Sequence, residues 1–189
     1  DGNDYTARTA ISVTILAGTL FTDIPVDILG DLITEPQETF TGTISLTNNN
    51  GQQASVGTAT ANGIINDNDP ATLAITGFTA DEDAGTADFT ITLSRNVQNT
   101  FTVDFATSDI TALAGALLDY TAVPTTTLTF GAANDLTQTV TVAINDDSWV
   151  EPTETLRGTL SNLAANSQAV TIPTPSAIAT INDNDAASI

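Results

Sequence analysis

The stretch VTVAINDDSWVEPTETL, residues 140–156, contains the pattern that decides the fold. It begins with a strict alternation, in which Val140, Val142 and Ile144 are separated by Thr141 and Ala143. An alternation of period two predicts a β-strand with one apolar face and one polar face. The strand pattern then ends in a run of aspartate, asparagine and glutamate before the next strand begins. The stretch therefore predicts strands whose ends carry acidic loops.

The same signals occur twice along the chain. Three motifs recur in the same order: DYTA at 4–7 and 119–122, EPQETF at 35–40 and EPTETL at 151–156, and INDND at 65–69 and 181–185. The first pair is 115 residues apart and the other two pairs are 116 residues apart. A common order at a nearly constant spacing indicates an internal repeat, so the repeat and not the chain is the folding unit.

The period sets the domain boundaries. Residues 70–185 form one complete copy, whereas residues 1–69 match only the part of that copy from its DY motif onward. Residues 186–189 resemble the start of a further copy. The partial copy is expected to hold four strands, near residues 10–16, 23–28, 39–46 and 57–65. We expect its first strands either to precede this sequence in the natural chain or to come from another molecule.

The fold class follows from the other strand patterns. Alternating apolar positions at 89, 91 and 93, and again at 101, 103 and 105, indicate further half-buried strands. The complete copy accommodates about seven such strands, which are separated by turn signals, and it shows no helical period. This pattern predicts an all-β protein of tandem immunoglobulin-like antiparallel β-sandwiches.

The charge and amino-acid composition exclude several classes of binding partner. In 189 residues there are 23 acidic side chains and three arginines, which gives a net charge of −20. Such a balance repels phosphate backbones and anionic lipid surfaces, so we expect no nucleic-acid partner. No apolar run reaches the about 18 residues of a membrane helix, so we expect no direct membrane insertion in this segment. Cysteine and histidine are absent, which disfavours zinc and copper sites.

The acids gather at the ends of the apolar runs. In the complete copy these acids are Glu82, Asp119, Asp146, Asp147, Glu151, Asp183 and Asp185. In the partial copy they are Asp4, Asp31, Glu35, Asp67 and Asp69. Neighbouring carboxylates raise one another's pKa and oppose folding, and a bound cation removes that cost. Hard divalent cations take six to eight oxygen ligands, and carboxylate, amide and carbonyl oxygens are what these loops supply, so we expect a site for such a cation.

Taken together, these motifs resemble the Calx-beta repeat, which is known from sodium/calcium exchangers and from large bacterial surface proteins. The resemblance covers residues 70–185 fully and residues 1–69 as a part repeat. It implies a seven-stranded sandwich that binds calcium in loops at one end, near the junction to the next domain. The family's ligand positions correspond to the seven acids of the complete copy. DNDP at 67–70 is also similar to the calcium-binding linkers of cadherins, but the DY and EPTE motifs favour Calx-beta.

The partial copy departs from the family pattern at the site. Gly30 stands where the complete copy has Asp146, and the counterpart of Glu82 would lie before Asp1. The middle position of the closing motif, often acidic in calcium-binding members, is asparagine in both copies, at Asn68 and Asn184. We therefore expect calcium to bind more weakly in the partial copy.

Several of these side chains have a simpler interpretation. Asp and Asn at strand ends are common turn formers that bond their own backbone. Glu154 and Glu38, the second acids of the EPxE motifs, are interpreted as solvated strand residues. Trp149 is expected to pack beneath the strand ends, and Tyr120 and Tyr5 are expected to anchor turns.

The function expected from the sequence is an extracellular, secreted or cell-surface, structural or adhesive repeat array that calcium rigidifies. Its partners would be neighbouring repeats and other copies of itself. One alternative is an extracellular filament whose subunits exchange strands, and another is a calcium-sensing module of a larger membrane protein. An enzyme is not expected, because the acids lie in polar loops and there is no histidine base or nucleophile elbow.

Overall fold

The computed structural model describes residues 4–115, 118–131 and 135–187. The chain divides into two compact units. The first unit comprises Asp1–Leu32 and Gln37–Asp67, and the second comprises Asn68–Ile189 together with Ile33–Pro36. Four residues from the partial copy thus fold as part of the second unit.

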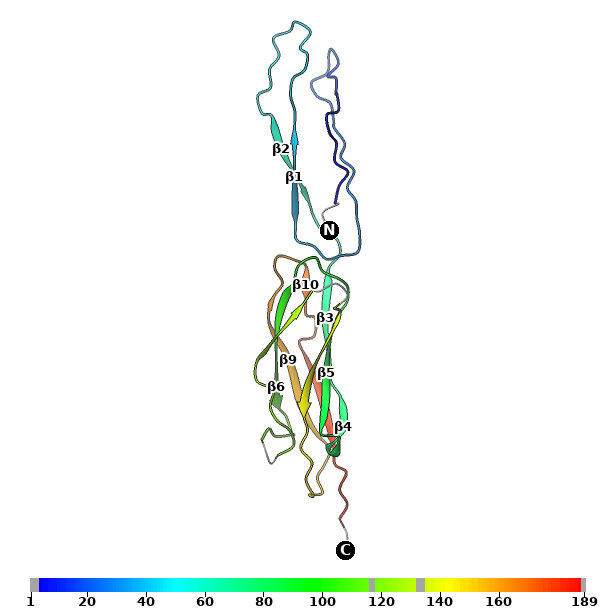
Figure 1. Ribbon diagram of the computed structural model, residues 1–189, viewed down its shortest axis with the longest axis vertical. Coiled ribbons are helices and arrows are strands. Elements are labelled where there is room, and N and C mark those ends of the chain that lie inside the picture. Colours follow the sequence, from blue (N-terminus) through cyan, green and yellow to red (C-terminus); the bar gives the residue numbers. More distant parts are fainter. Residues whose placement is uncertain (1–3, 116–117, 132–134, 188–189) are drawn as a thin grey trace. The chain divides into compact units, whose positions relative to one another are not determined.

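The second unit is built from two sheets (Figure 1). The four-stranded sheet has the order β10(Val170–Thr171), β3(Ala71–Thr76), β5(Thr86–Leu93), β8(Thr137–Ala143). The five-stranded sheet has the order β4(Thr79–Asp81), β11(Ser176–Asn182), β9(Glu154–Ala164), β6(Phe101–Asp109), β7(Thr126–Phe130). A short 3₁₀ helix, η1(Glu82–Ala84), lies between β4 and β5.

The core lies between the two sheets and consists of the apolar side chains on the inner face of each strand. Phe89 of β5 and Phe105 of β6 belong to different sheets, yet their ring centroids are 5.4 Å apart. Gly158 of β9 lies beneath both rings, since a Cβ there would come within 3.0 Å of each. Phe101 and Phe130 stack at 5.5 Å between β6 and β7. The prediction of an all-β sandwich is confirmed.

The strand count differs from the sequence-based expectation of about seven. The described part of the second unit has nine strands, and two of them are very short. β10 pairs with β3 in parallel, and β4 pairs with β11 in parallel. The reason is that the first apolar run bends between β3 and β4, so that it contributes to both sheets. The remaining pairings are antiparallel, as expected.

The first unit has less regular structure than predicted. Its two strands, β1(Glu38–Thr43) and β2(Thr60–Ile65), pair antiparallel, in agreement with the last two predicted strands. The strands predicted near residues 10–16 and 23–28 do not form, apart from one isolated bridge between Tyr5 and Ile28. In the complete copy the corresponding strands β7 and β8 are paired with β6 and β5, and the partial copy contains no counterpart of either.

Apolar side chains in the described part of the first unit are exposed where their counterparts in the complete copy are buried. Ile15 is 62% exposed, whereas Phe130, its counterpart in the complete copy, is fully buried. Ile28 and its counterpart Ile144 show the same contrast.

In the described part of the chain, no helix has the length and apolar character needed to cross a membrane.

Candidate metal centre

One end of the second unit, here called the acidic end, gathers eight carboxylates. They are Glu82, Asp119, Asp146, Asp147, Glu151, Glu154, Asp183 and Asp185. The connections between strands place them there: η1 provides Glu82, the segment after β8 provides Asp146 and Asp147, and the segment after β11 provides Asp183 and Asp185. Glu154 is the first residue of β9.

Local geometry fixes two of these connections. Gly85 ends η1 with a φ of +70°, a left-handed conformation that glycine adopts without strain. Its carbonyl accepts a hydrogen bond from the backbone N–H of Ile144 at 3.0 Å, which ties η1 to the end of β8. The Asn145 amide donates to the carbonyls of Gly115 and Leu118 at 2.8 and 2.5 Å. These bonds hold the segment before Asp119 against the end of β8.

The first carboxylate group consists of Glu82, Asp147 and Asp185, each of which contributes one oxygen within 4.8 Å of the others. Glu82 is only 6% exposed. Burial raises the pKa of Glu82, and the nearby Asp183, Asp147 and Asp185 raise it further. The Oδ2 atom of Asp185 is buried and makes no hydrogen bond within the described residues. A buried carboxylate oxygen in that state is costly unless a cation or another donor reaches it.

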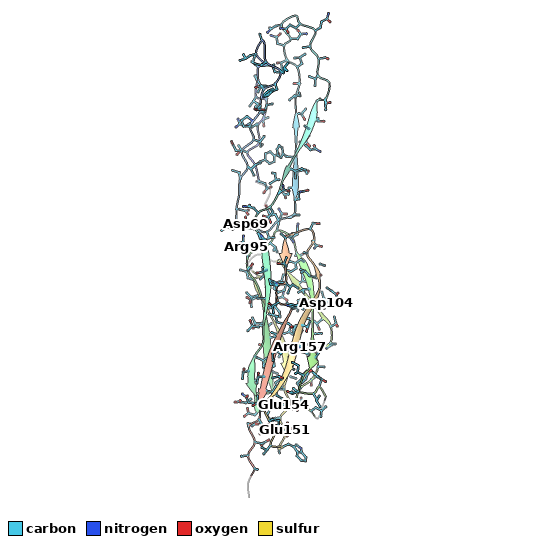
Figure 2. All side chains as sticks on the ribbon, turned by 180° about the vertical axis from the view of Figure 1, so that it is seen from behind. Asp69, Arg95, Asp104, Glu151, Glu154 and Arg157 are labelled. Atoms are coloured by element: carbon cyan, nitrogen blue, oxygen red, sulfur yellow. The ribbon has the colours of Figure 1, made fainter. Side chains whose placement is uncertain are left out.

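The second carboxylate group consists of Asp119, Glu151 and Glu154, again within 4.8 Å of one another. Glu154 is half-buried, and burial together with a hydrogen bond to Asp119 raises its pKa to about 7. A hydrogen bond between two carboxyl groups requires a shared proton, which lowers the negative charge of the group. Figure 2 shows Glu151 and Glu154 side by side at this end of the second unit.

Asp183 connects the two groups. One carboxylate oxygen of Asp183 accepts the backbone N–H of Glu151 at 3.0 Å, and the other accepts that of Asp185 at 3.0 Å. Burial, followed by Asp119 and then Asp147 and Asp183, raises the pKa of Glu151. Burial, followed by Asp183 and Asp146, raises the pKa of Asp185. The seven acids that the sequence predicts in the complete copy thus lie at one end of the sandwich, where their charges contribute to the raised pKa values of Glu82, Glu151 and Asp185.

The arrangement of the carboxylates fits a hard cation that is coordinated by oxygen ligands. Ca²⁺ is bound at about 2.3–2.6 Å from each oxygen, so ligand atoms on opposite sides of the ion lie up to about 5 Å apart. Three carboxylate oxygens within 4.8 Å of one another meet that requirement in each group. A cleft between the two groups is lined by residues of both, together with Leu118, Pro152 and Ile181. Backbone carbonyls and water would complete the six to eight ligands that calcium takes.

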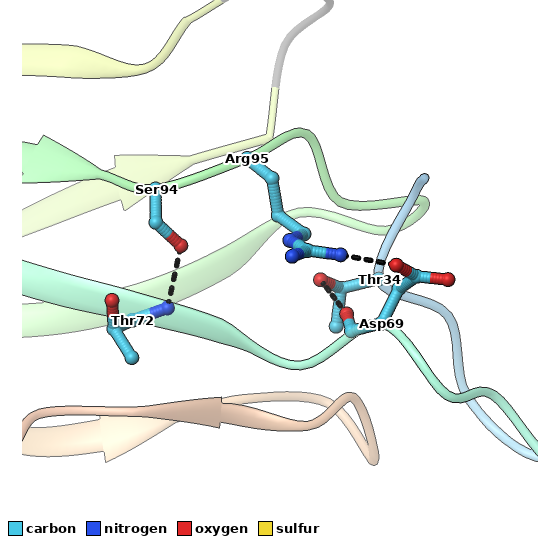
Figure 3. Close-up of polar contacts among 5 residues, drawn as sticks. All are labelled: Thr34, Asp69, Thr72, Ser94 and Arg95. Carbon is cyan, nitrogen blue, oxygen red and sulfur yellow. Dashed lines mark hydrogen bonds and ion pairs between the residues drawn. The ribbon is translucent and has the colours of Figure 1, made fainter. Parts of the chain in front are cut away.

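The acids of the partial copy are not gathered in this way. Among the described residues, both groups of three carboxylates belong to the complete copy. Asp4, Asp31 and Asp67 lie in the first unit, and Glu35 and Asp69 in the second. Asp69 forms an ion pair with Arg95 at the end of the second unit opposite the acidic end (Figures 2 and 3). Glu35 accepts a hydrogen bond from the Gln98 amide at 2.9 Å.

Two interpretations made from the sequence were wrong. Glu154 is part of the second carboxylate group and is not a solvated strand residue. The alternation of β9 contains the signal, because Glu154 lies on the same face as the buried Leu156, two residues away. Trp149 does not pack beneath the strand ends, since it is 73% exposed. The expectation for Tyr120 is confirmed: it is fully buried and its hydroxyl donates to Asp109 Oδ1 at 2.5 Å.

A β-sandwich with paired carboxylate groups at one end is the class of protein that this geometry defines. The sequence matches the family model of the Calx-beta domain over residues 1–69 and 71–185, so the chain belongs to the Calx-beta family. A search of curated proteins gave no match.

Several solved structures are similar to the chain. A structure described as the apo form of the Calx CBD1 domain has 21% identity and a TM-score of 0.53, over 62% of this chain and 100% of that one. A structure described as the calcium binding domain CBD12 of CALX1.1 has 20% identity and a TM-score of 0.52, over 61% and 47%. The Calx CBD2 domain has 14% identity and a TM-score of 0.51, over 60% and 86%. At these identities the likeness shows the fold alone.

Proposed function

We propose that the second unit is a calcium-binding module of an extracellular structural or adhesive repeat array. The observation that carries this proposal is the pair of carboxylate groups, Glu82–Asp147–Asp185 and Asp119–Glu151–Glu154, at one end of the sandwich. The family membership of the chain and the description of a similar structure as a calcium binding domain support it.

The role of the metal follows from electrostatics. Without a cation, the carboxylates of the acidic end repel one another, and burial of Glu82 and Glu154 adds to the cost. A calcium ion in each group offsets most of the charge of its three carboxylates, and the ion in the first group joins residues from η1, the segment after β8 and the segment after β11. The segment after β11 leads to residue 186, where a further copy would begin. Calcium therefore stiffens the connection to the next repeat.

The experiment is a comparison of calcium-loaded and chelated protein. Calcium should raise the melting temperature of the 189-residue chain and slow amide exchange in residues 145–154 and 181–185. For chains extended by further repeats, small-angle scattering should show a longer and narrower particle with calcium than with chelator. Unchanged melting and exchange at millimolar calcium would exclude the metal site, and unchanged scattering with intact binding would exclude the stiffening.

A self-assembling filament is a second candidate, because the first unit exposes apolar side chains. Leu20 is 96% exposed and Phe21 is 74% exposed. Strands of another molecule that pair with the first unit would cover them. Sedimentation over a wide concentration range distinguishes the candidates, because a monomer at every concentration excludes the filament.

A further inference from the structure

The second unit contains a short segment that precedes it in the sequence. Ile33–Pro36 belongs to this unit although its neighbours on both sides belong to the first. Thr34 lies beside Val97 in a parallel bridge, in which its N–H donates to Asn96 O at 3.0 Å and its carbonyl accepts from the N–H of Gln98 at 2.9 Å. Pro36 forms an antiparallel bridge with Gln168. The segment therefore pairs with the end of the sandwich through two isolated β-bridges.

Side chains strengthen this attachment. Thr34 is fully buried, and its hydroxyl donates to the backbone carbonyl of Asp69 at 2.6 Å, a contact drawn in Figure 3. The Glu35 carboxylate accepts the Gln98 amide at 2.9 Å. The Gln168 side chain, itself buried, accepts from the N–H of Asn99 at 2.9 Å and donates to the carbonyl of Asn99 at 2.8 Å. The surface that receives the segment is thus held in place by its own hydrogen bonds.

The internal repeat places a second such segment at the opposite end of this unit. Residues 149–152, with the sequence WVEP, correspond at a spacing of 116 to residues 33–36, with the sequence ITEP. The two differ in environment. Thr34 is fully buried, whereas its counterpart Val150 is 57% exposed, and the neighbouring Trp149 is 73% exposed. The same element is therefore covered in the first copy and uncovered in the second.

We propose that residues 149–152 are a docking strand for the following repeat of the array. Its occupant is the end of that repeat that bears the counterparts of Val97, Gln98 and Gln168, because these are the residues that receive Ile33–Pro36 in the second unit. The inference rests on the proposed tandem arrangement but not on calcium binding. Each repeat would then be joined to the next by a strand as well as by the linker after β11.

The residues of the docking strand suit this contact. Its Pro152 is identical to Pro36, so the bridge to a Gln168 counterpart is available, whereas the carboxylate of Glu151, the counterpart of Glu35, belongs to the second carboxylate group and is not needed for docking. Val150 has nearly the shape of threonine and fits the enclosed position of Thr34, although it cannot donate the hydroxyl hydrogen bond. The backbone bonds do not depend on the side chain. Trp149 replaces Ile33 with a larger apolar surface that the next repeat would cover.

Trp149 is the only tryptophan in the chain, so its fluorescence reports docking directly. The experiment extends the chain after Asp185 with a second copy of residues 70–185 in which the tryptophan is replaced by phenylalanine. Docking should shift the emission of Trp149 to shorter wavelength and lower its acrylamide quenching constant severalfold relative to the 189-residue chain. Equal emission and quenching in the two chains, with the added repeat folded by circular dichroism, would overturn the proposal.

Two variants of Val150 sharpen the test, and neither should unfold the protein, because the side chain is largely exposed. Val150→Thr restores the donor of Thr34 and should keep or increase the protection of Trp149. Val150→Gln is neutral but too long for an enclosed position of threonine size, so quenching should return to the value of the unextended chain. If neither variant changes the quenching constant of Trp149 in the extended chain, the tryptophan is covered in another way and the docking strand is refuted. The calcium titration is separate, so either proposal can fail alone.

Discussion

Replacing Glu154 with glutamine removes one negative charge from the second carboxylate group without changing the shape of the side chain. Glutamine keeps a donor for the Asp119 carboxylate, so the variant retains the contact that the shared proton provides. We expect two effects of opposite sign: the calcium-free protein becomes more stable at neutral pH, and its affinity for calcium falls.

The magnitude follows from the pKa of Glu154, which rises from 4.5 in the unfolded chain to about 7 in the folded protein. A carboxyl group with a raised pKa binds its proton more tightly when folded, so it destabilises the protein as pH rises from about 4.5 to about 7. At about 1.4 kcal/mol per pKa unit the upper limit is about 3 kcal/mol, and solvent screening of this half-buried group reduces it to about 1–2 kcal/mol. Glu154→Gln should therefore stabilise the chelated protein by about 1–2 kcal/mol at pH 8 and by almost nothing at pH 4.5.

The assay is urea denaturation of the chelated protein at these two pH values, followed by calcium titration by calorimetry. Calcium affinity should fall by about tenfold or more, as is typical when a group that supports a metal is lost. Glu38→Gln is the matched control, since Glu38 is the counterpart of Glu154 in the partial copy and lies outside both carboxylate groups. A destabilised Glu154→Gln variant at pH 8, or a gain that persists at pH 4.5, would refute the electrostatic account.

Three further predictions test the fold. Gly158→Ala should lower the stability by about 1–3 kcal/mol, because the new methyl group meets the Phe89 ring at 2.7 Å. The counterpart substitution Gly42→Ala should change the stability by less than about 0.5 kcal/mol. Thermal melting of both variants checks this contrast, and equal losses would contradict it. Thr34→Val should lower the stability of the second unit by about 1 kcal/mol, because the buried hydrogen bond of the Thr34 hydroxyl is lost. The loss should appear as faster amide exchange at residues 96–98, and unchanged exchange would contradict the pairing of Thr34 with this segment. Tyr120→Phe removes a hydrogen bond to a carboxylate and should cost about 2 kcal/mol in urea denaturation, and a neutral result would show that the bond does not contribute.

The sequence predicts much of the second unit because two signals agree there. The alternation of β5, β6 and β8 fixes which side chains enter the core, and the repeat shows where the copy begins and ends. The gathering of the acids of the complete copy follows from the same patterns, since they lie in connections between strands that end at the same edge of the sandwich.

The partial copy shows the limit of local patterns. Residues 10–16 have the alternation of a strand, but a strand needs a neighbour for its N–H and carbonyl groups, and the counterpart of β6 is not present in that copy. Glu154 was missed because an acid on a strand is usually solvated, and only the position of the facing Asp119 shows otherwise. The inclusion of Ile33–Pro36 in the second unit depends on pairing between segments about 60 to 130 residues apart, which no local pattern encodes.

Calorimetric titration of the chelated 189-residue chain with calcium tests the central claim most directly. The two carboxylate groups predict at least two calcium ions per chain, with binding that weakens as pH falls below about 7, where Glu154 takes up its proton. The Asp119→Asn and Asp185→Asn variants should each weaken a different part of the isotherm. Absence of binding heat at millimolar calcium, or binding that both variants leave unchanged, would contradict the assignment of the acidic end as a calcium site.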